Sequence, residues 1–306
     1  MTRSSVRAAV LGHPVGHSLS PVLHAAAYEA LGLTTAHYTR RDVPVGEWDT
    51  FWADARAAGD WGGFSVTMPL KPLAARDADR VTPLVRALGV ANTLTFEDDG
   101  RVVADNTDVM GIMSAVSAAG AIPGTPRAVV LGGGATASAA VAALHGLGAE
   151  TVDVVVRTPS RARTLEAVAR AVGTEVRTVA WEHAAEALHT ADVVVATLPP
   201  RGADELALQW RAQAPSVSGV LLDAAYDPWP SRLASAWQDA GGAIAPGVDM
   251  LIFQAVDQVR WFTQGDPRAA VPHEDRVTAA MCRAVGRPER GIPQRVRTAQ
   301  ATRLAP

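Results

Sequence analysis

Three consecutive glycines, Gly132 to Gly134, constrain the fold of this chain more than any other feature of its sequence. A hydrophobic run at 128–131 precedes them, an alanine-rich run at 135–147 follows, and a second hydrophobic run occupies 151–157. This order is typical of a strand, a tight turn, a helix and a parallel strand, in which the turn lets the backbone approach a pyrophosphate. A glycine cluster alone would also fit a tight structural turn. The strand before it and the helix and strand after it favour a dinucleotide site, so we predict a dinucleotide-binding α/β unit.

The same alternation extends along most of the chain. Ser20-Pro21 predicts a helix start, with the serine capping free N–H groups, and Asp108 precedes an apolar stripe of helical spacing. Alternating strands and helices favour parallel sheets covered by helices on both faces. Further strands are expected at 6–12, 36–41, 63–67, 91–96, 101–104, 176–180, 192–197 and 219–223, and further helices at 160–172, 182–189 and 249–264.

Length and composition limit the class of protein. A chain of 306 residues is long enough for two domains, and 48% apolar with 19% charged residues is a globular balance. The net charge of −3 argues against a nucleic-acid partner. The single cysteine, Cys282, excludes an internal disulfide and a cysteine-built metal site. Because no window approaches the ~20 apolar residues of a membrane span, we expect a cytoplasmic protein without a membrane partner.

The end of the second predicted strand indicates the cofactor. An NAD site would carry Asp or Glu there to bind the ribose 2′-hydroxyl. This strand instead ends at Val156-Arg157-Thr158, and Arg161 and Arg163 follow. Cations at this point suit a 2′-phosphate, so the sequence favours NADP. The alternative is that these are solvated surface arginines in an arginine-rich chain.

The segment Gly16-His17-Ser18-Leu19-Ser20 is close to the G-x-S-x-G elbow of hydrolases. The last position is serine and a proline starts the helix, so the strained turn of an elbow is not indicated. Binding of a small carboxylate by Ser18 and Ser20 is the better interpretation. Pro14 and Gly16 break the spacing that would bring nearby histidines together, and no metal site is predicted.

Lys71 is the only lysine among 28 basic residues, the other 27 being arginine. Lysine offers a titratable amine, whereas guanidinium stays protonated at any working pH. The lysine therefore either occupies a site where arginine cannot replace it, or remains by chance on a solvent-exposed face.

Six ordered segments together resemble the shikimate dehydrogenase family. They cover residues 6–265, nearly the whole chain apart from the tail. The segments are Gly12-His-Pro-Val-Gly-His-Ser-Leu-Ser-Pro21 with His24, Ser65-Val-Thr-Met-Pro-Leu-Lys71, Ala91-Asn-Thr93, Asp105-Asn-Thr-Asp108, Asp223-Ala-Ala-Tyr-Asp-Pro228 and Gly247-Val-Asp-Met-Leu-Ile-Phe-Gln-Ala255.

The resemblance implies an enzyme that reversibly reduces 3-dehydroshikimate to shikimate with NADPH, in aromatic amino acid (chorismate) biosynthesis. It implies a two-domain α/β fold, with an N-terminal α/β substrate domain, a Rossmann-type NADP-binding domain and a cleft between them. The expected boundaries are 1–108 for the substrate domain, 109–246 for the NADP domain, 247–285 for C-terminal helices that return to the substrate domain, and 286–306 for a mobile tail.

The resemblance also assigns the site residues. Lys71 would be the catalytic acid/base, paired with Asp108. Substrate would contact Ser18, Ser20, Thr67, Asn92, Asp108, Tyr226 and Gln254. NADP would contact Gly132, Gly133, Gly134, Ala135, Thr136, Arg157, Thr158, Arg161, Thr197, Ala224 and Gly247. The expected partner is the small-molecule substrate, and the expected assembly is a monomer or a homodimer.

The chain departs from the family pattern in several places. The family usually has Asn at the positions of Ser65, Ala25 and Val156, and commonly Gly at the position of Ala135. Its Asn-Ala-Thr-Ser segment is reduced here to 195–197. Two other interpretations stay open: a quinate or aminoshikimate dehydrogenase of the same fold, and a ligand sensor without enzymatic activity. Intact Lys71 and Asp108 argue against the sensor.

Overall fold

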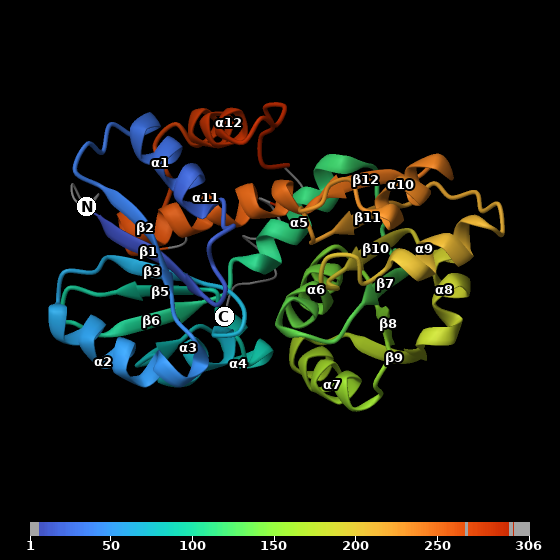
Figure 1. Ribbon diagram of the computed structural model, residues 1–306, viewed down its shortest axis with the longest axis horizontal. Helices are drawn as coiled ribbons and strands as arrows, with labels where there is room; N and C mark the ends of the chain where they lie inside the picture. Colours follow the sequence, from blue (N-terminus) through green and yellow to red (C-terminus); the bar gives the residue numbers. More distant parts are fainter. Residues whose placement is uncertain (1–5, 267–268, 294–295, 297–306) are drawn as a thin grey trace. The chain divides into compact units, whose positions relative to one another are not determined.

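The computed structural model describes residues 6–266, 269–293 and 296, which form two compact units (Figure 1). The first unit is built from two separate stretches of chain, one up to Thr107 and one from Ile252 to Gly291. The second unit includes the intervening residues, Asp108 to Leu251. Both units are α/β, so the predicted two-domain α/β fold is confirmed. In the described ranges no helix has the length and apolar character needed to cross a membrane.

A mixed sheet forms the centre of the first unit. Its strands are β1 (Arg7–Gly12), β2 (His37–Asp42), β3 (Gly63–Val66), β4 (Arg80–Val81), β5 (Thr93–Phe96) and β6 (Val102–Asp105). Among the described residues their order is β2-β1-β3-β5-β6-β4. β1 pairs in parallel with β2 and β3, whereas β5 is antiparallel to β3 and β6. The carboxyl ends of β1 and β3 therefore lie at the same edge of the sheet.

Helices cover both faces of this sheet (Figure 1). They are α1 (Ser20–Ala30), α2 (Trp48–Ala58), which the short helix η1 (Val45–Glu47) precedes, α3 (Lys71–Asp77), α4 (Pro83–Leu88), α11 (Gly247–Gln264) and α12 (Glu274–Ala284). Trp48, Trp52 and Leu70 join Phe64 in the apolar core on the side of α2, α3 and α4. On the other side α1 packs against α12. A Cβ on Gly63 would lie only 2.4 Å from the Phe262 ring of α11, so helix and strand are in close contact.

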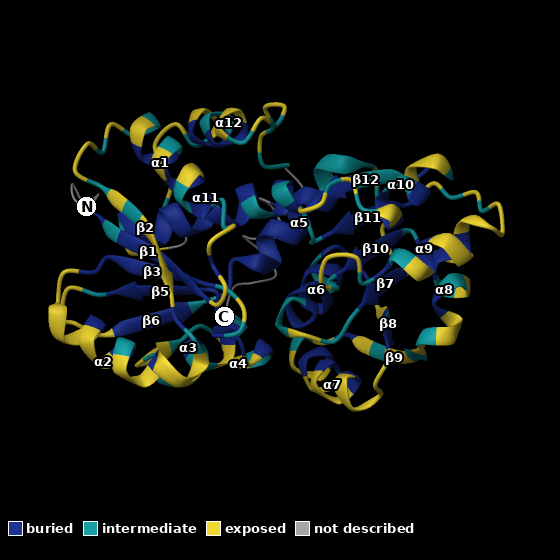
Figure 2. Cartoon of the chain, viewed as in Figure 1, coloured by how far each residue is buried: buried dark blue, intermediate teal, exposed yellow. Residues whose placement is uncertain are grey.

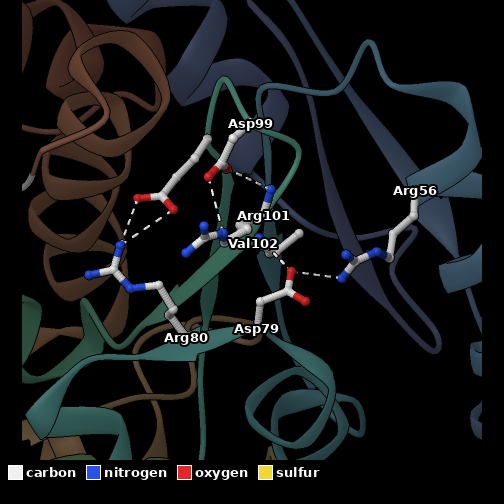
Figure 3. Close-up of polar contacts among 7 residues, drawn as sticks. Arg56, Asp79, Arg80, Asp99, Arg101 and Val102 are labelled. Carbon is white, nitrogen blue, oxygen red and sulfur yellow. Dashed lines mark hydrogen bonds and ion pairs between the residues drawn. The ribbon is translucent and has the colours of Figure 1, made fainter.

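Polar contacts fix the short strand β4 and the turn between β5 and β6 (Figure 3). Asp79 accepts hydrogen bonds from Arg56 of α2 and from the backbone N–H of Val102, each at 2.8 Å. The bond from Arg56 holds the pKa of Asp79 below its ordinary value. Arg80 pairs with Glu97 at 3.2 Å across the turn. Such exposed pairs contribute little to stability, and they mainly set the position of the turn.

The sheet of the second unit is entirely parallel. Its strands are β7 (Ala128–Leu131), β8 (Thr151–Val156), β9 (Glu175–Ala180), β10 (Val193–Ala196), β11 (Val220–Asp223) and β12 (Ala243–Pro246). In the described chain they are ordered β12-β11-β10-β7-β8-β9. This is the doubly wound Rossmann order. The chain adds β8 and β9 on one side of β7 and β10 to β12 on the other, so the order of strand addition reverses between β7 and β10. In such sheets ligands bind outside the carboxyl ends of the strands at this point.

Helices also cover both faces of the second sheet (Figure 1), and its strands are largely buried except for the edge strand β9 (Figure 2). They are α5 (Asp108–Ala119), α6 (Ala135–Gly146), α7 (Ser160–Val172), η2 (Trp181–His183), α8 (Ala184–Thr190), α9 (Asp204–Arg211) and α10 (Arg232–Asp239). Trp210 of α9 and Trp237 of α10 are fully buried and stack with ring centroids 5.4 Å apart. They belong to the apolar core that α8, α9 and α10 form with this sheet.

The periodic segments have the predicted structure, and one local prediction is wrong. The strand at 151–156 and the helix at 160–172 are confirmed. Ser20 does not cap α1 but is its first residue; the Ser18 hydroxyl instead accepts from the Ser20 N–H at 3.3 Å. The predicted mobile tail at 286–306 falls largely outside the described residues.

Candidate active site

Two loops at the carboxyl ends of β1 and β3 carry several of the predicted substrate residues. The backbone N–H of Thr67 donates to Leu11 at 2.8 Å, and that of His13 donates to Met68 at 3.1 Å. These bonds align the loop after β1, which leads to Ser18 and Ser20, with the loop after β3, which carries Thr67. Close packing supports the alignment, because a Cβ on Gly12 would lie 2.4 Å from the Thr67 methyl carbon.

The two serines differ in exposure and in their contacts. Ser20 is buried with 4% of its surface exposed, whereas Ser18 is half-buried. The Tyr38 hydroxyl on β2 contacts the hydroxyl of Ser65 and also hydrogen-bonds with Ser20. Removal of the phenol from water raises the pKa of Tyr38 above its ordinary value, and the bonds to Ser65 and Ser20 oppose this. Tyr38 therefore links two hydroxyl side chains at the edge of the sheet as a neutral phenol.

Asn92 and Gln254 meet in a buried amide cluster. The Asn92 side chain donates to Thr107 Oγ1 at 3.0 Å and to Gln254 Oε1 at 3.3 Å, and its own oxygen accepts from the Thr107 N–H at 2.8 Å. Thr107 also donates to Gln254 Oε1 at 3.2 Å. Asn92 comes from the turn before β5 and Gln254 from α11, so the first unit brings together two predicted site residues that are distant in sequence.

A second glutamine, one turn further along α11, extends this cluster. Gln258 donates to the Asn92 carbonyl oxygen at 3.3 Å and to Thr93 Oγ1 at 3.2 Å. Its side-chain oxygen lies 3.3 Å from Nε2 of His24. The His24 ring stacks on Tyr38 with centroids 3.9 Å apart. A continuous set of buried contacts therefore runs from the amide cluster to the serines.

Burial keeps His24 neutral. Its side chain has no exposed surface, and desolvation lowers its pKa from 6.5 to about 3, although the bond with Gln258 acts in the opposite direction. A neutral ring can lie flat on Tyr38 without bringing a charge into the apolar interior.

Lys71 and Asp108 are both buried, with 7% and 5% of their surfaces exposed. Lys71 is the first residue of α3, and its carbonyl oxygen accepts from the Ala91 N–H at 3.0 Å, which ties it to the residue before Asn92. Asp108 begins α5 and directly follows Thr107 of the amide cluster. Tyr226 is half-buried in the loop after β11, in the second unit.

The glycine turn after β7 lies at the switch point of the second sheet. Gly132 has φ of +115°, a conformation that side-chain-bearing residues rarely adopt, and a Cβ there would lie 2.6 Å from Thr197 Oγ1. Thr197, just after β10, donates through its hydroxyl to the Leu131 carbonyl oxygen at 3.0 Å. The structure thus brings together the predicted cofactor residues Gly132 and Thr197.

Gly133 closes the other side of the turn. A Cβ on Gly133 would lie 2.8 Å from Cβ of Arg161 and 3.2 Å from a methyl carbon of Val156. Gly134 caps α6, whose first turn carries Ala135 and Thr136. The N–H groups of that turn and the helix dipole favour an anion. The tightly packed turn and the N-terminus of α6 fit a pyrophosphate, as the sequence predicts for NADP.

The remaining predicted cofactor residues follow the carboxyl ends of β8, β11 and β12. Thr158 and Arg161 are linked by a backbone hydrogen bond of 3.0 Å. Arg157 follows β8 and donates to the Gly202 carbonyl oxygen at 2.8 Å. At the end of β11, a Cβ on Gly247 would lie 2.4 Å from the Ala224 carbonyl oxygen, so these two residues are in contact.

Comparison with known proteins supports the two-unit architecture. Residues 10–94 match the model of the shikimate dehydrogenase substrate binding domain, and residues 103–248 match that of the alanine dehydrogenase/PNT C-terminal domain. A shikimate dehydrogenase (NADP(+)) of Rubrobacter xylanophilus is 37% identical over 84% of this chain and 90% of its own length. The chain belongs to the shikimate dehydrogenase family. The family predicted from the six segments is therefore confirmed.

Solved structures of shikimate dehydrogenases have the same fold. The Mycobacterium tuberculosis enzyme is 38% identical, with a TM-score of 0.78 over 90% of this chain and 99% of its own. The Thermus thermophilus enzyme, solved in complex with NADP(H) and shikimate, is 31% identical, with a TM-score of 0.72 over 91% of this chain and 99% of its own.

Sequence reasoning overlooked residues that hold this candidate site together. Tyr38 contacts Ser65, the position at which the family usually has Asn, and nothing in the strand pattern distinguishes that tyrosine. Gln258 was detectable, because it lies four positions after Gln254 and so shares its helix face.

Proposed function

We propose that this chain catalyses the reversible, NADPH-dependent reduction of 3-dehydroshikimate to shikimate, in the cytoplasm and as a monomer or homodimer. The observation that carries the proposal is the buried lysine, the only one in the chain, at the start of α3, where its carbonyl oxygen bonds with the residue before Asn92 of the amide cluster. NADPH supplies the hydride when bound. The rest of the chemistry belongs to side chains of the protein.

Lys71 is the acid/base in this proposal. Reduction of a ketone produces a developing alkoxide, which needs a positive charge beside it and then a proton. An ammonium group meets both needs, and in the reverse direction the neutral amine accepts the proton. In this proposal Asp108 would pair with Lys71 and orient its amine toward the reacting oxygen.

The polar side chains of the first unit would bind the substrate. Ser18 and Ser20 would hold the carboxylate through their hydroxyls, and Tyr38 supports Ser20 in this task. The ring hydroxyls would be bound by Thr67, Asn92, Asp108 and Gln254, with Tyr226 close to the substrate. Bonds between Asn92, Thr107 and Gln254 support this role, because they orient both amides before the substrate arrives.

The second unit would bind NADP. The turn at Gly132 to Gly134 and the first turn of α6, with Ala135 and Thr136, would hold the pyrophosphate. Arg157, Thr158 and Arg161 would bind the 2′-phosphate, since no carboxylate ends β8 to accept from a 2′-hydroxyl. Thr197, Ala224 and Gly247 would complete the cofactor contacts. The packing of Gly133 against Arg161 and Val156 supports this assignment, because it leaves no room for a side chain and keeps the glycine turn close to the end of β8.

Initial rates followed at the NADPH absorbance band test the proposal. Shikimate, quinate and aminoshikimate are each offered with NADP and with NAD. Shikimate with NADP is expected to give the highest kcat/KM, and the Lys71→Met variant serves as the control for non-enzymatic change in absorbance.

The two alternatives predict other outcomes. Equal or better turnover of quinate or aminoshikimate would assign the chain to that substrate instead. Binding of shikimate without turnover under any cofactor would indicate a ligand sensor. Better turnover with NAD would overturn the cofactor assignment alone.

A further inference from the structure

The register of β8 and β9 places an aromatic ring beside the arginine at the end of β8. Val156 pairs with Ala180, so Arg157 and Trp181 are the first residues beyond the paired ends of two adjacent parallel strands. The Arg157 guanidinium carbon lies 4.6 Å from the centroid of the Trp181 ring. This is within the range of a cation–π interaction, for which tryptophan is the best partner.

A second contact, with the loop that follows β10, holds the same guanidinium. Nη2 of Arg157 donates to the Gly202 carbonyl oxygen at 2.8 Å, in the loop between β10 and α9. The guanidinium of an exposed arginine is therefore fixed by a ring and by a carbonyl. Because that bond uses one of five N–H groups, the planar fork keeps donors for a phosphate.

Trp181 is itself held in place by the fold. Its side chain is half-buried and packs on the apolar core that α8 and α9 form with the sheet. The Ala184 N–H donates to its carbonyl oxygen and closes the turn of η2. The ring is thus a fixed support, whereas the arginine it carries lies at the surface.

We propose that Trp181 is a positioning residue for cofactor selection, which holds Arg157 ready for the 2′-phosphate of NADP. The inference rests on the proposed function, in which Arg157 binds that phosphate. An arginine free in solvent loses side-chain entropy when it binds an anion, and a preformed stack removes part of that cost. Trp181 thereby favours the 2′-phosphate without touching it.

Calorimetric titration with adenosine 2′,5′-bisphosphate and with 5′-AMP tests this inference apart from turnover. Trp181→Leu should weaken binding of the bisphosphate roughly two- to tenfold and leave 5′-AMP unchanged, as expected for the loss of a cation–π contact and of preorganisation. Trp181→Phe retains an aromatic face and should recover part of the affinity. His183→Ala, an exposed residue of the same turn, should have no effect.

A double-mutant cycle with Arg157→Ala distinguishes positioning from general support of the domain. Arg157→Ala should weaken the bisphosphate selectively, and adding Trp181→Leu should then cost nothing further. The inference is wrong if Trp181→Leu weakens both nucleotides equally, or if its effect persists without Arg157.

Failure of this inference and failure of the proposed function are distinguishable. If Arg157→Ala weakens the bisphosphate but Trp181→Leu does not, the phosphate site stands and the role of Trp181 is refuted. If the wild type binds the two nucleotides equally, NADP selection itself fails, and the positioning role fails with it. If shikimate is not turned over although the bisphosphate result holds, only the reaction is wrongly assigned.

Discussion

At the residue scale, the candidate site depends on polar side chains that are buried and held by one another. Asn92 accepts and donates hydrogen bonds with Thr107 and Gln254, and Gln258 connects the cluster to His24. Such networks orient their members at little further cost when a ligand binds, provided that most of their donors and acceptors are satisfied. Because these residues share hydrogen bonds, substitutions within the cluster should be coupled rather than additive.

Replacement of Lys71 by methionine should remove the acid/base while preserving the shape of the side chain. General acid–base catalysis contributes typically ~10²–10⁴-fold, so kcat should fall at least about 10²-fold. Substrate affinity, measured by calorimetry with shikimate, should change much less. Activity within a few-fold of the wild type would exclude Lys71 from the mechanism.

Replacement of His24 by glutamine should reduce the acid sensitivity of the protein. The folded state holds His24 neutral down to a pKa of about 3, whereas the unfolded chain protonates it near 6.5. The unfolded state therefore binds more protons as the pH falls, and stability present above pH 6.5 is lost below it. At 1.36 kcal/mol per unit, the wild type should lose about 2 kcal/mol more than the variant between pH 7 and pH 5.

Urea unfolding at the two pH values measures this difference. The exposed His17→Gln variant is the control, and it should follow the wild type. An equal pH dependence in the wild type and His24→Gln would show that burial does not hold His24 neutral.

At the element scale, α12 is attached to α11 by a buried charge cluster. Arg260 of α11 pairs with Asp257 of the same helix and with Glu274 at the start of α12, and the exposed fractions of these side chains are 8%, 8% and 14%. Buried charges are costly unless they are paired, so each member depends on the others.

Replacement of Arg260 by methionine should destabilise the protein by ~3–5 kcal/mol, because two largely buried carboxylates lose the guanidinium that pairs with both of them. Chemical denaturation measures the effect. Arg283→Ala, which breaks an exposed pair with Glu289, is the matched control and should cost less than ~1 kcal/mol. Similar small losses in both variants would mean that the buried cluster does not secure α12.

At the scale of the whole molecule, the first unit is discontinuous in sequence. Its sheet comes from the first third of the chain, and residues 252–291 supply helices that cover one face. Trp261 donates to Asp105 at 2.7 Å, and Gln258 bonds with Asn92 and Thr93. The second unit takes its whole sheet from one continuous stretch.

Truncation after Leu251 should therefore affect the two sheets unequally. Hydrogen exchange followed by mass spectrometry should show loss of protection in β3 and β5, because Gly63 loses the Phe262 ring and Asn92 loses both glutamines. Protection in β7, β8 and β10 should remain close to that of the full chain. Retained protection in β3 and β5 would show that the first unit folds without its C-terminal stretch.

The sequence by itself determined the features that depend on local pattern. Hydrophobic periodicity predicted β8 and the helix at 160–172, and the glycine cluster predicted the turn at Gly132. These features can be predicted locally because side-chain periodicity and the conformational freedom of glycine are properties of near neighbours in the chain. The six family segments supplied the candidate residues, including Lys71 and Gln254.

Only the tertiary structure decided which distant residues meet. Sequence analysis did not predict the short elements β12, α9 and α10, although the buried positions of α10 follow helical spacing. Gln258 bonds with Asn92 across 166 positions, and Trp181 lies beside Arg157 because of the register between β8 and β9. A sequence pattern predicts which face of an element is buried, but the packing of whole elements determines which residues lie against that face.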